Sequence, residues 1–213
     1  EEILINLDQE ICQNYFSTYK ELISRRSQNE PVAYILQEKE FWSKNFFVSY
    51  DTLIPRPETE LMVEKLVKIF DEKKISILDM GTGSGCILIS LLSELTNSKG
   101  LGIDISKKAI IIAKKNLRKH SMQGRIKFLN KSLDSEFYQK FDLIVSNPPY
   151  IRSNELKNLK EDIKKHEPRI ALDGGNDGLD LIKKVIYKTK NILKFKGKLA
   201  LSLIHISEPT RRS

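Results

Sequence analysis

The first place in the sequence where chemistry is expected is the tetrapeptide Asn147-Pro148-Pro149-Tyr150. It follows an apolar run, residues 141–146, that predicts a buried strand. The two prolines hold the backbone extended and lack N–H donors, so the segment presents carbonyl oxygens. Asn147 adds a side-chain carbonyl acceptor, and Tyr150 can lie against a flat group. Converging acceptors suit an NH2 group, although the tetrapeptide alone would indicate only a proline-rich turn.

A second motif is the glycine-rich loop that follows the apolar run 75–80. Glycines at alternate positions permit a tight turn and let a ligand approach the backbone closely. A dinucleotide fingerprint would require glycine where Cys86 stands, and the lysine of a P-loop is absent. Asp79 would repel a pyrophosphate but suits an ammonium group, such as the one on S-adenosylmethionine. The ligand-binding residues predicted in this loop are Asp79, Gly81, Thr82, Gly83 and Gly85.

Asp104 ends the next apolar run, 23 residues after Gly81. An acid at this position accepts hydrogen bonds from ribose hydroxyls, although alone it would indicate only a surface turn. The two motifs together predict an S-adenosylmethionine-dependent methyltransferase that acts on a weakly nucleophilic nitrogen. The Asn147 side chain and the Pro148 carbonyl would accept hydrogen bonds from the NH2 group and orient its nitrogen for in-line attack. The proton can leave to water, so no histidine base is required.

From residue 75 the chain alternates predicted strands and helices, which indicates an α/β fold with a doubly wound, Rossmann-like parallel sheet. Ligands bind such sheets at the carboxyl ends of the central strands, where both motifs lie. Ser106 is expected to cap the second of these helices. The predicted strands are 75–80, 101–104, 126–129, 141–146 and 198–203, and a long loop and a helix over about 179–193 precede the last one.

The part before residue 75 predicts a smaller helical unit and a linker. Apolar residues at three- and four-residue spacing indicate a helix that ends near Arg25-Arg26. An aromatic hairpin is expected over 41–48, with its turn at Lys44-Asn45. The expected organisation is a partial helical docking domain (1–38), a hairpin and linker (39–60), a catalytic domain (61–203) and a non-native tail (204–213).

Composition narrows the class of protein without deciding it. With 40% hydrophobic and 30% charged residues, the 213-residue chain is typical of a globular protein. No apolar run approaches membrane-spanning length, and two distant cysteines imply no disulfide framework, so the cytoplasm is the expected compartment. The charge of +8 permits contact with RNA, but scattered lysines usually indicate solvated surfaces. No metal site is expected, because His120, His166 and His205 fit no ligand spacing and are predicted to lie on the surface.

These motifs together resemble the HemK/PrmC-type peptide chain release factor glutamine methyltransferases. Besides the two motifs above, the resemblance rests on Arg25-Arg26, on the segments 31–35 and 53–60, and on 167–179, which reads EPRIALDGGNDGL. It implies methylation of the side-chain amide of the glutamine in the Gly-Gly-Gln motif of release factors, with no membrane partner. It also implies that the substrate-binding residues are Asn147, Pro148, Pro149, Tyr150 and Arg56, with Asn147 also close to the cofactor.

The chain departs from this family pattern in three places. Family members usually have Ser-Asp-Trp after the third strand, whereas this chain has Lys131-Ser132-Leu133. Ser132 is therefore expected to supply a hydrogen bond to the cofactor, and Leu133 an apolar face in place of an indole. The helical domain is shorter than in the family and the end of the chain differs, so we expect a fragment truncated at both ends.

Two alternatives remain open from the sequence. The same tetrapeptide occurs in adenine and guanine amino-methyltransferases, and such an activity would better explain the basic charge. No segment offers a separate target-recognition domain, which is an argument against it. The second alternative is an inactive fragment that binds S-adenosylmethionine without catalysis.

Overall fold

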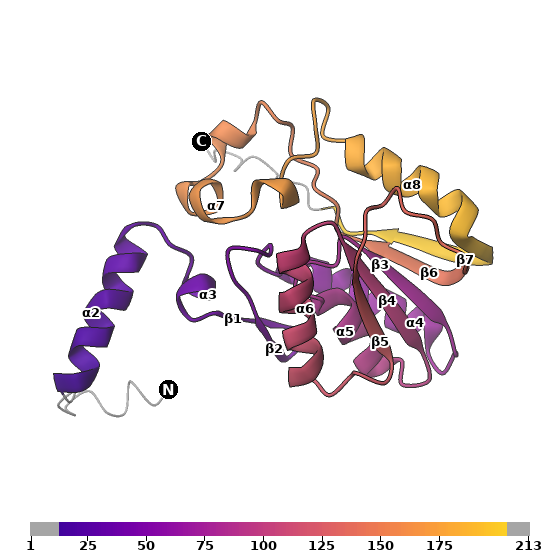
Figure 1. The fold of residues 1–213 in the computed structure, drawn as a ribbon, viewed down its shortest axis with the longest axis horizontal. Coiled ribbons are helices and arrows are strands. Elements are labelled where there is room, and N and C mark those ends of the chain that lie inside the picture. Colours follow the sequence, from indigo (N-terminus) through magenta and orange to yellow (C-terminus); the bar gives the residue numbers. More distant parts are fainter. Residues whose placement is uncertain (1–12, 204–213) are drawn as a thin grey trace, which may run out of the picture.

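The computed structural model describes residues 13–203, with side chains from residue 16 onward. Its centre is a five-stranded parallel sheet in the order β5-β4-β3-β6-β7 (Figure 1). The chain enters at the central strand, proceeds to one edge, and returns beside its starting point. The predicted doubly wound sheet is therefore confirmed. Its strands are β3 (Ser76–Met80), β4 (Lys99–Asp104), β5 (Ile126–Asn130), β6 (Phe141–Ser146) and β7 (Leu193–Leu201).

Helices cover both faces of this sheet because its short strands are apolar on both sides. On one face, α4 (Glu60–Phe70), α5 (Cys86–Glu94) and α6 (Lys107–Lys119) share a core with Ile77 and Leu143. On the other face, α8 (Asp180–Ile192) packs through Val185 and Ile192 against alternate strand residues such as Leu78 and Ile144. Figure 1 shows α8 on the side of the sheet opposite α4 and α5.

Two predicted helix boundaries agree with the structure. The Ser106 hydroxyl accepts a hydrogen bond from the Ala109 amide at 3.1 Å and so caps α6. The N-terminal helix, α2 (Gln13–Ser27), ends just after Arg25-Arg26, and a short helix, α3 (Val32–Ile35), follows it. The predicted positions before residue 13 lie outside the described residues.

The aromatic hairpin is present, but the predicted turn is wrong. Strands β1 (Glu38–Phe41) and β2 (Lys44–Phe47) are joined by Trp42-Ser43, both in left-handed backbone conformations with φ of 53° and 51°. Lys44 and Asn45 belong to β2 instead. Bulky residues rarely adopt positive φ, so nothing in the sequence indicated that the turn lies at Trp42. Trp42 is held by the bond from its backbone N–H to the Glu60 carboxylate at 3.0 Å.

The segment predicted as a long loop contains short helical elements: η2 (Leu156–Asn158), α7 (Glu161–His166) and η3 (Arg169–Ala171). Strand β7 begins five residues before the predicted strand, because Leu193 already pairs with Phe141 across a bulge. The histidines were predicted to lie on the surface, and His120 and His166 are half-buried there. Each has a buried Nε2 atom, and the His166 ring stacks on Tyr50 with 6.0 Å between centroids. His205 lies outside the described residues.

Candidate active site

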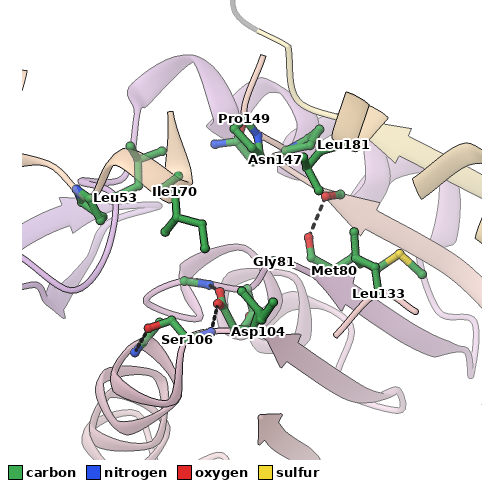
Figure 2. A pocket seen from close by; sticks show the side chains of 18 of the residues that line it. Leu53, Met80, Gly81, Asp104, Ser106, Leu133, Asn147, Pro149, Ile170 and Leu181 are labelled. Carbon is green, nitrogen blue, oxygen red and sulfur yellow. Dashed lines mark hydrogen bonds between the residues drawn. The ribbon is translucent and has the colours of Figure 1, made fainter. Parts of the chain in front are cut away.

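A cavity of about 770 Å³ opens at the carboxyl ends of β3, β4 and β6, where the direction of chain winding reverses. Figure 2 shows Asn147 and Pro149 on one side, Asp104 and Ser106 on the opposite side, and Gly81 between them. Both sequence motifs therefore reach one cavity. The predicted site residues that line it are Gly81, Thr82, Gly83, Asp104, Ser132, Leu133, Asn147, Pro148 and Pro149.

The glycine loop forms an open floor for a ligand. Gly81 and Gly83 have φ of +74° and +54°, and a Cβ built at either position meets nothing within 4 Å. A side chain here would thus occupy the space in which a ligand lies against the backbone. Gly85 has a different role, since a Cβ there would approach the Phe128 ring to 2.8 Å. It allows α5 to begin close against the sheet and is not among the cavity-lining residues.

Asp104 stands opposite the tetrapeptide with both carboxylate oxygens in use. Oδ2 accepts from the Gly83 amide at 2.9 Å, and Oδ1 accepts from the Ser106 amide at 2.8 Å. Burial raises the pKa of Asp104, and these two amides oppose the rise. Each carboxylate oxygen has a second lone pair, so the side chain can also accept from a vicinal diol. It fixes the glycine loop at the same time.

Asp79 lies behind the loop rather than on the cavity wall. It is fully buried, its Oδ2 accepts from the Thr82 hydroxyl at 2.6 Å, and its Oδ1 has no partner among the described residues. Burial raises the pKa of Asp79 to about 7. A buried oxygen without a hydrogen-bond donor destabilises the folded chain, and a bound cation would remove this penalty. Direct contact between Asp79 and an ammonium group stays a prediction.

The Asn147 side chain faces the cavity, and no hydrogen bond joins it to another residue in the described part of the chain. Its amide oxygen is thus available to a ligand. Behind it, the buried Ser146 hydroxyl donates to the Met80 carbonyl at 2.6 Å and ties the ends of β6 and β3 together. This bond fixes the tetrapeptide relative to the glycine loop.

Two predicted substrate-binding residues are not among the residues that line the cavity. The Arg56 guanidinium donates to the Glu167 carboxylate at 2.6 Å instead. The Tyr150 backbone lies against Gly174 and Gly178, where an added Cβ would come within 2.8 Å of the Tyr150 Cα and 2.4 Å of its carbonyl oxygen. These close approaches explain the glycines of the 167–179 motif.

Sequence reasoning missed part of the cavity wall. Leu53 comes from the linker and Ile170 from η3, and both line the cavity. Ile105, beside Asp104, lines it too and is 63% exposed. The EPRIAL segment was recognised as a motif, but nothing local indicated that it faces the tetrapeptide. Cys86 also lines the cavity, and burial raises the pKa of its thiol to about 12, so it is not an activated nucleophile.

Comparison with known proteins identifies the relatives of this chain. Two family models match: the methyltransferase small domain over residues 56–176, and the PrmC N-terminal domain over residues 1–36. The Buchnera aphidicola (subsp. Schizaphis graminum) release factor glutamine methyltransferase is 42% identical over 92% of this chain and 70% of its own length. The Rickettsia typhi bifunctional methyltransferase is 37% identical, and the chain spans 43% of that protein.

A solved structure shows the same fold at low sequence identity. The S-adenosylmethionine-dependent methyltransferase from Agrobacterium tumefaciens superposes with a TM-score of 0.53 at 17% identity, covering 78% of this chain and 53% of that one. Among the described residues no helix is long and apolar enough to cross a membrane. The predicted resemblance is confirmed: the chain belongs to the release factor glutamine methyltransferase family, whose members use S-adenosylmethionine.

Proposed function

We propose that the protein represented by this chain methylates the side-chain amide of the glutamine in the Gly-Gly-Gln loop of a peptide chain release factor. The observation that carries the proposal is the unpaired Asn147 amide facing the glycine loop across one cavity. A cavity with an amide acceptor and two prolines at one end fits a planar carboxamide. We propose that the enzyme acts in the cytoplasm, the compartment in which release factors act.

The chain's residues fit S-adenosylmethionine as the methyl donor. The open backbone at Gly81 and Gly83 accommodates a ligand at van der Waals distance, and Asp104 offers acceptors to ribose hydroxyls. The unpartnered Asp79 oxygen lies beneath the same loop and complements an ammonium group. When bound, the cofactor supplies an electrophilic methyl group on a sulfonium.

The residues at the other end act on the acceptor. A carboxamide nitrogen is a poor nucleophile because its lone pair is delocalised into the carbonyl. The Asn147 side-chain oxygen and the Pro148 carbonyl accept hydrogen bonds from its two N–H groups, which increases electron density on the nitrogen and fixes its direction of attack. The hydrogen bond from the buried Ser146 hydroxyl to Met80 fixes the position of these acceptors relative to the glycine loop. Water takes the proton afterwards.

The comparisons favour a protein acceptor over a nucleic acid. The matching relatives named as release factor glutamine methyltransferases cover most of this chain. Of the three basic residues that line the cavity, Lys184 pairs with Asp134 at 2.8 Å and Arg169 pairs with Asp173 at 3.4 Å, which leaves Lys131 without an acidic partner among the described residues. The alternative of a nucleic-acid methyltransferase is therefore not favoured.

The test is a methylation assay with purified chain, labelled S-adenosylmethionine and three acceptors: a release factor, the same factor with its motif glutamine changed to alanine, and an RNA. We expect label only in the unmodified release factor. Label in the RNA, or in the factor without its glutamine, would contradict the proposal.

A further inference from the structure

One buried carboxylate, that of Glu167, joins two segments that are more than a hundred residues apart in the chain. Its side chain is 1% exposed. Oε1 accepts from the Arg56 guanidinium at 2.6 Å, and Oε2 accepts from the Ile54 amide at 3.3 Å. Within the described residues, both hydrogen bonds that join segment 51–56 to segment 167–171 end on this carboxylate.

These two segments form one side of the cavity. Asp51, Thr52, Leu53 and Pro55 line it from the first segment, and residues 168–171 line it from the second. Neither segment includes a residue predicted to bind the cofactor, so this side is open to the acceptor. Ile170 is 60% exposed, and Figure 2 shows its side chain extending toward the middle of the cavity.

The geometry makes the contact hard to replace. Glu167 closes α7, and Pro168 follows it directly, so the carboxylate sits on a backbone that is fixed on both sides. Burial raises the pKa of Glu167, and the positive charge of Arg56 opposes this rise. Without the carboxylate, the buried Ile54 amide and the partly buried Arg56 guanidinium would both lose their acceptor.

We propose that Glu167 is a positioning residue for the acceptor: it holds segment 51–56 against segment 167–171 and so sets the width of the acceptor side of the cavity. This rests on the proposed function, because the acceptor is the release factor loop. A further contact holds the first segment: the buried Tyr34 hydroxyl donates to the Thr52 carbonyl at 2.7 Å. Segment 51–56 is thus held at Thr52, Ile54 and Arg56, and Leu53, which lines the cavity, lies between these points in the chain.

The decisive variant is Glu167→Gln, which keeps the side-chain shape but removes the charge and one acceptor oxygen. We expect the KM for the release factor to rise by about tenfold or more, since a charge-assisted contact is lost. The Kd for S-adenosylhomocysteine should stay unchanged. The matched control is Glu161→Gln on the same helix, whose exposed pair with Lys165 contributes little. Arg56→Lys should retain more acceptor affinity than Arg56→Met.

A second measurement tests the contact between Glu167 and segment 51–56 in the absence of a release factor. Hydrogen exchange at the Ile54 amide should accelerate in Glu167→Gln and not in Glu161→Gln. If the wild-type chain failed to methylate a release factor, the proposed function would be contradicted, and the exchange rate would still decide whether Glu167 holds the two segments. Unchanged KM in Glu167→Gln would overturn the proposal, with or without faster exchange. Equal loss of cofactor and acceptor affinity would also overturn it, because that indicates general destabilisation.

Discussion

The buried Asp79 carboxyl should make the stability of the ligand-free chain depend on pH in an unusual direction. Its pKa is about 7 in the folded chain, against 3.8 for an ordinary aspartate, because burial disfavours the charged form. The folded chain therefore holds this proton where the unfolded chain releases it. The stabilising contribution is complete below pH 4 and is lost as pH rises toward 7.

The size of the effect follows from the difference between the two pKa values. About three pH units correspond to about 4 kcal/mol of unfolding free energy, at about 1.4 kcal/mol for each unit. Neighbouring groups add to it in known directions. The Thr82 hydroxyl favours the charged form of Asp79, and the nearby Asp104 carboxylate opposes it. Asp104 and Glu167, whose pKa values burial also raises, give slopes of the same sign, so the wild-type profile alone is not diagnostic.

The assay is therefore a comparison of denaturant unfolding between wild type and Asp79→Asn from pH 4.5 to 7.5. Asparagine has nearly the same shape and can still accept from Thr82, but it does not titrate. We expect the unfolding free energy of wild type to fall by several kcal/mol from pH 4.5 to 7.5, because Asp79 loses its proton. The unfolding free energy of the variant should lack this contribution, so the advantage of wild type over the variant should be largest at low pH. Asp134→Asn, at an exposed carboxylate, is the control. Parallel profiles for wild type and Asp79→Asn would refute the reasoning.

Two further predictions concern the cofactor side of the cavity. Asp104→Ala should weaken S-adenosylmethionine binding by about 1–3 kcal/mol, because it removes a charged acceptor and frees the Gly83 amide; unchanged affinity in calorimetry would show that the ribose lies elsewhere. Leu133→Trp should tighten binding by about 1 kcal/mol, because an indole stacks on adenine better than an aliphatic side chain does, and calorimetry that shows weaker binding would place adenine away from Leu133.

Most of the sheet could be predicted because its strands are short apolar runs separated by turn residues. The floor of the cavity could be predicted equally well, since the glycine loop and the tetrapeptide both follow such strands. The start of strand β7 was predicted too late because Lys194 and Lys196 interrupt its apolar pattern at the sheet edge. The division into domains stays a prediction.

The acceptor side of the cavity could not be predicted from local patterns. Arg56 and Glu167 were both within recognised motifs, yet their pairing depends on how the linker folds back over 111 residues. The expected substrate role of Arg56 came from the family resemblance, which did not indicate its partner. Asp79 was predicted to bind the ligand together with the glycine loop, whereas the alternation of β3 directs its side chain into the face covered by α5.

The central claim is that Asn147 activates and orients a release factor glutamine. The most direct test measures, by mass spectrometry, the mass added to the Gly-Gly-Gln peptide of a release factor after incubation with S-adenosylmethionine and either wild type or Asn147→Ala. We predict one added methyl group on the glutamine with wild type and almost none with the variant, while the Kd for S-adenosylhomocysteine changes little. Near-normal methylation by Asn147→Ala, or methylation at another residue of the peptide, would contradict the account.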